Sequence, residues 1–371
     1  MKSALSALAV FVVVSFPAGA QTRTPAPLTA PGLVVSTGSA APKGGSPAKV
    51  DDVRILESGV ADPFELERLG LAAVNANQLD RARALFEQAW KRGELPTAAY
   101  NLACLDARAG HADQAFARLD RAIAAGFDDG VSLEKDPDLA SLRVQPRFAS
   151  IVSGAARNRA AGDAAVVKEG VFLLPTEKAL AVLLLIHDKE SDPFTVSSPF
   201  TDVALSHHLV VAAPRGPGRS AKRRFGWGSA ERAEKAIDAA VAAARAKAHD
   251  QKLPVFLVGV GRGGTEVLRV AARKPAGTFA GAGSIGGPFD PGTSPNPAGL
   301  RGTRLFLGYS RDAAPAELAA VRRGIEVLRQ QGLRPVVAEW PGASSGIPKD
   351  AGRAVKETLD AFAGIAPAAA R

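Results

Sequence analysis

The sequence predicts an α/β domain with a mostly parallel sheet covered by helices, preceded by an all-α helical module. Between residues 166 and 366, short runs of consecutive apolar residues alternate with long amphipathic stretches. That pattern is typical of parallel strands buried on both faces. Between residues 63 and 125, apolar and alanine residues recur at helical spacing. The length of 371 residues suffices for two domains, each with its own core.

The first twenty residues are typical of a signal peptide. Lys2 provides a basic start, an apolar run covers residues 4–16, and Ala18, Gly19 and Ala20 form the small-residue pattern of a cleavage site. We therefore expect a signal peptide over 1–20, cleaved after Ala20, and a periplasmic or secreted protein. A retained anchor is the alternative, but the run is shorter than the roughly 20 apolar residues of a spanning helix. No membrane span is expected in the mature chain.

Residues 21–60 are dominated by Pro, Thr, Ala, Gly and Ser without a hydrophobic period, which predicts a disordered linker. The single cysteine, Cys104, excludes an intramolecular disulfide. The net charge of +9 comes from basic residues interleaved with acidic ones, so we expect a solvated surface and no nucleic-acid partner. One basic run in a Gly/Pro/Ser-rich loop leaves binding of an anionic ligand open as an alternative to solvation: Arg215, Arg219, Lys222, Arg223 and Arg224.

The helical part contains an internal repeat. Residues 77–82 correspond to residues 110–115, and the same offset along the chain pairs small residues such as Ala89 with Ala122. This pattern resembles tetratricopeptide repeats, which implies a groove for a protein or peptide. A generic pair of helical hairpins is the alternative. Only about two repeats are visible, so the module needs a neighbour for stability.

A segment after the repeats resembles the capping segment at the end of such arrays. It contains Asp136, Pro137, Leu139 and Phe148. With this segment the module is expected to extend over 61–157.

From residue 166 onward, the apolar runs predict strands and the amphipathic stretches predict helices. The expected strands are 170–174, 180–186, 209–213, 255–258, 279–285, 305–308 and 336–339, and the expected helices are 229–248, 265–273, 316–331 and 349–364.

A glycine-rich turn follows the strand at 255–258. Residues 259–264 read Gly-Val-Gly-Arg-Gly-Gly, and the next helix is expected near Thr265. Strand, tight turn and helix are the setting of the G-x-S-x-G nucleophile elbow. With the strand that leads into His187 and Asp188, this turn resembles that of an α/β-hydrolase of the esterase type. The resemblance implies an oxyanion loop at His187 and Asp188, where the family usually carries His-Gly.

The residues that the resemblance assigns to a catalytic triad do not form one. Gly261 stands at the nucleophile position and has no side chain to react. Asp312 follows a late strand where the family places its acid, and Ser345 stands where its histidine would be. The hydrolase order is nucleophile, acid, then histidine, and no histidine follows His249. The general base is therefore missing in any alignment of this region.

Other chemistry of the same region has weaker support. Gly259, Gly261 and Gly264 also fit the G-x-G-x-x-G pattern of a dinucleotide-binding turn, but the turn follows the fourth expected strand instead of the first. Exposed amides at the start of the helix could still hold an anion. Ser284 and Ser310 are conceivable relocated nucleophiles without an evident base.

The sequence therefore predicts an exported, non-catalytic binding or scaffold protein. The helical module would bind a protein or peptide, and the hydrolase-like domain would keep a residual pocket for a small molecule or anion. The alternative is a divergent serine-type esterase or peptidase with an unconventional catalytic arrangement. No cofactor and no metal are expected. The expected residual pocket comprises His187, Asp188, Gly261, Arg262, Gly263 and Trp340.

Overall fold

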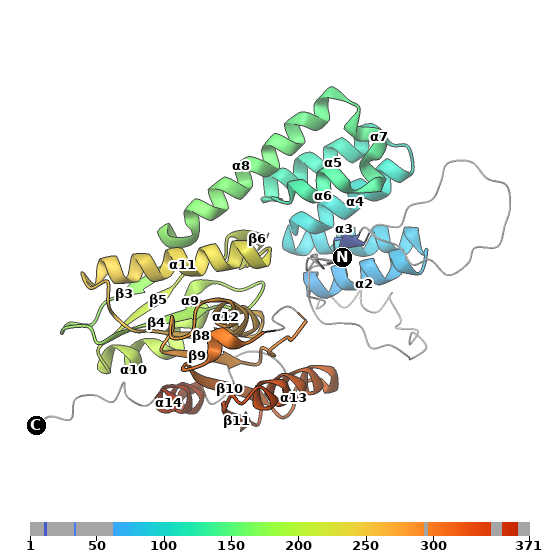
Figure 1. Cartoon of the computed structure of the whole chain (residues 1–371). Helices are drawn as coiled ribbons and strands as arrows, with labels where there is room; N and C mark the ends of the chain where they lie inside the picture. Colours follow the sequence, from blue (N-terminus) through green and yellow to red (C-terminus); the bar gives the residue numbers. More distant parts are fainter. Residues whose placement is uncertain (1–10, 13–32, 35–61, 293–295, 343–350, 363–371) are drawn as a thin grey trace, which may run out of the picture. The chain divides into compact units, whose positions relative to one another are not determined.

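The structure is a computed structural model, which describes residues 11–12, 33–34, 62–292, 296–342 and 351–362 (Figure 1). The chain divides into two compact units, residues 1–161 with 218–223 and residues 162–217 with 224–371. The predicted signal peptide and linker lie outside the described residues, except for the antiparallel pair β1 (Phe11–Val12) and β2 (Leu33–Val34). Ser345 also lies outside them.

The first unit contains two helical hairpins that match the internal repeat of the sequence. Helix α2 (Pro63–Asn75) corresponds to α4 (Pro96–Arg108), and α3 (Leu79–Gly93) corresponds to α5 (Ala112–Ala125), at the same offset along the chain. Proline is the first residue of both α2 and α4, where its missing N–H is no loss and its fixed φ suits a helix. Small residues allow close packing. At Gly70, for example, a Cβ atom would lie 2.5 Å from the ring of Phe86.

The segment after the hairpins forms short helices and then one long helix. The short ones are α6 (Gly130–Lys135), η1 (Pro137–Leu139) and α7 (Ala140–Arg143). The long helix α8 (Pro146–Lys168) continues beyond residue 157, where the sequence places the end of the module, and the two units divide within it.

One short segment belongs to the first unit, although the residues before and after it in the sequence belong to the second unit. This segment comprises residues 218–223 and includes β6 (Gly218–Ala221). Ala221 is buried in the same cluster as Leu66, Leu102 and Leu105. The segment therefore completes the hydrophobic core of α2, α3 and α4.

The second unit is built on a seven-stranded sheet with the order β11-β10-β9-β8-β4-β5-β3, in which only the edge strand β3 runs antiparallel to its neighbour. The strands are β3 (Val171–Leu173), β4 (Ala181–Ile186), β5 (Leu209–Ala213), β8 (Val255–Val260), β9 (Gly281–Ile285), β10 (Arg304–Ser310) and β11 (Val336–Trp340). A further strand, β7 (Arg224–Gly226), lies outside this sheet.

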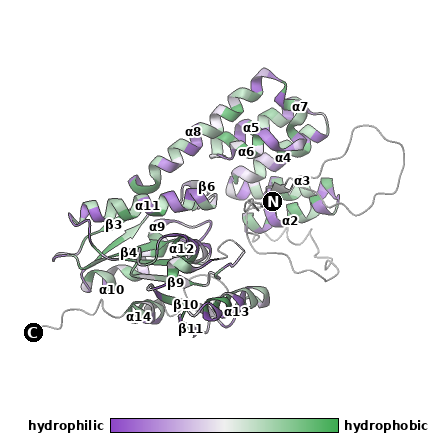
Figure 2. Ribbon diagram, viewed as in Figure 1, coloured by the Kyte–Doolittle hydropathy of each residue, from purple (hydrophilic) through white to green (hydrophobic). Residues whose placement is uncertain are grey.

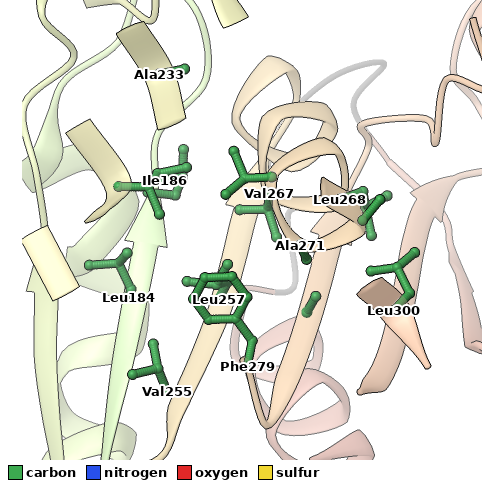
Figure 3. Close-up of a cluster of buried hydrophobic side chains, with 14 of the residues drawn as sticks. Leu184, Ile186, Ala233, Val255, Leu257, Val267, Leu268, Ala271, Phe279 and Leu300 are labelled. Atoms are coloured by element: carbon green, nitrogen blue, oxygen red, sulfur yellow. The ribbon is translucent and has the colours of Figure 1, made fainter. Parts of the chain in front are cut away.

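Helices cover both faces of the sheet, because successive strand residues point to opposite sides. On one face, Leu184 of β4 belongs to a cluster that includes residues of α11 (Ala230–Lys247), α12 (Arg262–Arg273) and α13 (Pro315–Gln330); Figure 3 shows part of this cluster around α12. Leu185 instead joins the cluster on the other face, with α9 (Pro193–Ser197), η2 (Ser198–Phe200), α10 (Thr201–Ser206) and α14 (Ala351–Ala361). The short η3 (Ala298–Leu300) packs beside α12. Hydrophilic and hydrophobic residues alternate along the covering helices (Figure 2).

The predicted fold class is confirmed, since a mostly parallel sheet covered by helices follows the helices α2 to α7. All seven expected strands are present, with ends that differ by no more than a few residues. The expected start of the helix near Thr265 is wrong, because α12 begins at Arg262. The short α9 and α10 have no counterpart among the expected helices. Within the described part of the chain, no helix has the length and apolar character needed to cross a bilayer.

Candidate functional site

The candidate site lies where β4 and β8 end side by side. The two strands are parallel and Ile186 pairs with Gly259. Two residues further along each strand, Asp188 and Gly261 therefore lie at the same edge of the sheet. Binding sites of open α/β sheets usually form outside this carboxyl edge.

Gly261 forms the sharp turn between β8 and α12. Its φ of 52° and ψ of −121° place it in a region that L-residues with a side chain rarely adopt. The N–H of Gly261 donates to the carbonyl oxygen of Ile285 at 2.7 Å, and its carbonyl oxygen accepts from the N–H of Gly264 at 3.0 Å. The turn thus has the strained strand-to-helix geometry of a nucleophile elbow, without a nucleophile.

The carboxylate of Asp188 fills the space beside Gly261. A Cβ atom built on Gly261 would lie 2.2 Å from Asp188 Oδ2 and 2.3 Å from Cγ and Oδ1. Any side chain at position 261 therefore requires Asp188 to move. The position of the Asp188 carboxylate thus depends on the missing side chain at Gly261.

One oxygen of this carboxylate accepts two backbone hydrogen bonds. Asp188 Oδ1 accepts from the N–H of Arg262 at 2.7 Å and from the N–H of Lys189 at 2.7 Å. Burial raises the pKa of the Asp188 carboxyl, and these hydrogen bonds partly oppose the rise. Enzymes with a nucleophile elbow hold an oxyanion with the amide after the nucleophile and with an amide of the loop after an earlier strand. In this chain the amide after Gly261 and an amide of the loop after β4 both donate to Asp188 Oδ1.

His187, the other residue of the predicted oxyanion loop, is a buried structural side chain. Its Nε2 accepts from the N–H of Gly216 at 2.9 Å, so the proton is on Nδ1, which donates to the carbonyl oxygen of Asp188 at 2.6 Å. The ring lies 4.7 Å from that of Trp227, whose Nε1 donates to the His187 carbonyl oxygen at 2.9 Å. Both ring nitrogens are occupied, so His187 orients the loop that carries Asp188 and is not free to act as a base.

The neutral state of His187 predicts a pH dependence of stability. Burial lowers its pKa from 6.5 to about 4, although the hydrogen bond to Asp188 opposes this. As the pH falls, His187 takes up a proton near pH 6.5 in the unfolded chain but only near pH 4 in the folded one. The free energy of unfolding of the second unit therefore decreases between about pH 6.5 and 4. The loss is about 3 kcal/mol.

An NMR titration measures the effect directly, and the His187 ring signals should shift only below pH 5. A midpoint near 6.5 in the folded protein would contradict the assignment. The raised pKa of Asp188 acts on stability in the opposite direction, because its contribution declines as the pH rises. The ring signals are therefore a more specific measurement than overall stability.

An ion-pair cluster anchors the first turns of α12. Glu266 Oε1 lies 2.8 Å from Arg262 Nη2, and Glu266 Oε2 accepts from Arg269 Nε at 2.8 Å. The side chains of Glu266 and Arg269 are 1% and 4% exposed. Arg269 Nη2 also donates to the carbonyl oxygen of Ala230 at 2.6 Å, which joins α12 to the start of α11. The side chain of Arg262 is thus held by Glu266.

Asp312, the expected triad acid, accepts a backbone hydrogen bond from the segment that follows β11. Its Oδ2 accepts from the N–H of Gly342 at 2.7 Å, and Ser310 Oγ donates to the Gly342 carbonyl oxygen at 2.6 Å. Ser284 is fully buried, and its Oγ donates to the carbonyl oxygen of Gly287 at 2.6 Å. Neither serine hydroxyl is presented as a free nucleophile.

Two other predicted pocket residues have packing roles. Trp340 is 2% exposed, and its Nε1 donates to Glu357 at 2.8 Å while its ring covers Gly308. It belongs to the core instead of a pocket wall, because the missing side chain at Gly308 leaves room for the indole. Gly263 is buried in the first turn of α12, where a Cβ atom would lie 2.2 Å from the Ile186 carbonyl oxygen.

The dinucleotide alternative conflicts with the occupied turn. A pyrophosphate would need the amides at the start of α12. The amide of Arg262 instead holds Asp188, whose carboxylate would repel phosphate. The glycines of the pattern serve the close approach of β8, α12 and the loop after β9.

The basic loop is partly used for packing. Arg215 is buried, pairs with Glu169 at 2.8 Å and lies over the ring of Phe225. The side chain of Arg219 packs against Gly126, where a Cβ atom would lie 2.9 Å from its Cδ. Lys222 and Arg223 are exposed, and ordinary solvation accounts for them.

The helical unit contains a buried polar cluster between α4 and the segment around Asp136. Asp136 Oδ2 accepts from the Tyr100 hydroxyl at 2.6 Å and from the Cys104 thiol at 3.6 Å, and Oδ1 accepts from the N–H of Asp138 at 2.9 Å. Burial raises the pKa of the Cys104 thiol, and burial next to Asp136 raises the pKa of Asp138 to about 8. Although Cys104, Asp136 and Asp138 are close enough for a metal ion, the hydrogen bonds already explain the arrangement, because they tie the segment after the hairpins to α4.

Comparisons with known proteins give distant likenesses. No protein-family model matches the sequence, and no curated protein matches it. An uncharacterized protein from Bacillus cereus ATCC 10987 is 14% identical, with a TM-score of 0.44, 82% of this chain covered and 99% of that one. Esterase PE8 is 16% identical, with a TM-score of 0.45 over 52% of this chain and 98% of the esterase. The Bacillus cereus carboxylesterase is 14% identical, with a TM-score of 0.38 over 52% and 94%. Similarities this distant carry no conclusion about activity.

Proposed function

We propose that the chain is an exported, non-catalytic binding or scaffold protein with a degenerate hydrolase-like domain. One observation carries the proposal. The carboxylate of Asp188 occupies both the space of a nucleophile at position 261 and the hydrogen bonds that an oxyanion would need. Removing the nucleophile and the base of a catalytic unit leaves only positioning and oxyanion stabilisation. Here Asp188 occupies the oxyanion position as well.

The helical unit supports the binding part of the proposal. Its two hairpins repeat at a constant offset, and the resemblance to tetratricopeptide repeats favours a protein or peptide as partner. The export part rests on the signal-like residues 1–20, which favour a periplasmic or secreted location.

A divergent hydrolase is the second candidate, and Asp188 itself favours it. Carboxylates act as nucleophiles in some hydrolytic enzymes, and this one lies where a nucleophile would stand. Against this candidate, two amides donate to Asp188 Oδ1. A substrate oxyanion that used these amides would have to displace the Asp188 carboxylate, which is the nucleophile itself in this mechanism. His187, which precedes Asp188 in the same loop, has both ring nitrogens in hydrogen bonds.

Ester hydrolysis by the purified full chain distinguishes the two candidates. With p-nitrophenyl acetate we expect no saturable turnover, with an apparent kcat/KM below about 1 M⁻¹s⁻¹, against 10⁴ to 10⁸ for typical enzymes. The Asp188→Asn variant, which keeps the shape of the side chain, should give the same rate. A fluorophosphonate probe should leave the protein unlabelled.

Two results would overturn the proposal. The first is saturable turnover that is lost in Asp188→Asn, which would make Asp188 a catalytic group. The second is stoichiometric labelling of a serine by the probe, which would restore the serine-type interpretation.

A further inference from the structure

We propose that Asp188 is an internal plug. Its carboxylate closes an anion site that is otherwise formed, and the site takes a small external carboxylate once the plug is removed. The site consists of the amides of Arg262 and Lys189, which come from two different segments of the second unit. The proposal is independent of whether the chain has catalytic activity.

The arrangement of donors supports an anion as the natural occupant. Both N–H groups point at a single oxygen, at 2.7 Å each. Distances of about 2.7 to 3.1 Å to one oxygen are those of a preorganised oxyanion site. The amide of Arg262 also belongs to the first turn of a twelve-residue helix, where the positive end of the helix dipole favours negative charge.

Contacts that do not involve the Asp188 carboxylate also hold the two segments that carry the donors, so we expect both amides to keep their places when it is removed. Gly261 is fixed by its hydrogen bond to Ile285, and the side chain of Arg262 is tied to Glu266. On the other side, His187 is held by Gly216 and by Trp227. These contacts come from different strands and loops of the second unit. Removing one carboxylate therefore leaves two oriented amides without an acceptor.

The atoms removed from Asp188 also define the size and charge of the ligand that the emptied site should bind. Asp188→Ala removes one carboxylate group and leaves the Cβ atom, so formate matches the missing atoms. In Asp188→Asn the side-chain oxygen remains available to the two amides. Formate should therefore bind to Asp188→Ala and not to Asp188→Asn or the wild-type chain.

The test compares thermal unfolding in sodium formate with unfolding in sodium chloride of equal ionic strength, for the full-length protein. We expect formate to raise the Tm of Asp188→Ala saturably, by about 4 °C at concentrations near ten times a millimolar-range Kd. In the wild-type chain and Asp188→Asn the two salts should give the same Tm. The matched control is Asp192→Ala, which removes a carboxylate that accepts from the N–H of Thr195 at 3.0 Å at the start of the short α9.

A second measurement locates the ion. In ¹⁵N-labelled Asp188→Ala, formate should shift the amide signals of Lys189 and Arg262 first and most. Equal responses of Asp188→Ala and Asp192→Ala to formate would overturn the proposal. So would a formate response without shifts at these two amides. If Asp188→Ala does not fold, the same two measurements are made on Asp188→Gly with acetate, which matches the larger group that this substitution removes.

Discussion

Replacing Glu266 by Gln is expected to destabilise the second unit by about 3 kcal/mol. The substitution keeps the size of the side chain but removes its charge, and so leaves the buried guanidinium of Arg269 without a counter-ion. Breaking a buried ion pair on one side typically costs about 3 to 5 kcal/mol. Urea unfolding followed by tryptophan fluorescence measures the effect, since Trp227 and Trp340 lie in this unit.

The control for this prediction is Glu231→Gln. Glu231 pairs with Lys235 at 2.8 Å, but both side chains are about three-quarters exposed, at 77% and 74%. Its loss should cost less than about 0.5 kcal/mol. In the background of Glu266→Gln, the further change Arg269→Met removes the uncompensated charge and should recover at least half of the stability. A double variant less stable than Glu266→Gln would show that the cost does not come from the unpaired charge.

Replacing Gly261 by Ala should destabilise the second unit by about 3 kcal/mol, and about half of this cost should depend on Asp188. Two effects add together. The backbone conformation at positive φ costs about 1 to 3 kcal/mol for a residue with a side chain. The new methyl group also drives the Asp188 carboxylate off its two amides, which costs about 1 to 2 kcal/mol more.

A double-mutant cycle separates the two effects. In an Asp188→Ala background, Gly261→Ala should cost about half as much as in the wild-type chain, because only the backbone term remains. Gly302→Ala is the matched control, since Gly302 has a φ of 75° with no atom within 4 Å of its Cβ position. It should cost about 1 kcal/mol in both backgrounds. Additive costs of the Gly261 and Asp188 substitutions, within about 0.5 kcal/mol, would contradict the mutual dependence.

The sequence is informative about the turn because glycine patterns reflect backbone geometry directly. The spacing of the glycines places Gly261 at an elbow, and the structure has the expected sharp turn after β8. Asp188 departs already in the sequence from the pattern that this region resembles, which usually has His-Gly at these two positions. Its insertion beside Gly261 is not predictable from the sequence, because that depends on the register of β4 against β8 and on the rotamer of one side chain.

Other features have little signal in the sequence. The three-residue error at the start of α12 arises because Gly263 and Gly264 have low helix propensity, whereas packing against Ile186 and Ser284 fixes them there. Glu266 and Arg269 look like an ordinary surface pair at i, i+3. Only the tertiary fold shows that they are buried.

The assignment of residues 218–223 to the first unit affects how this chain can be cut into fragments. Ala221 is buried in the same cluster as Leu66, Leu102 and Leu105, although it comes far after them in the sequence. A fragment that ends at residue 161 therefore contains every helix of the two hairpins but lacks part of their covering. Neither unit is a continuous stretch of sequence. Gene fusion or exchange at a single junction therefore cannot transfer either unit whole.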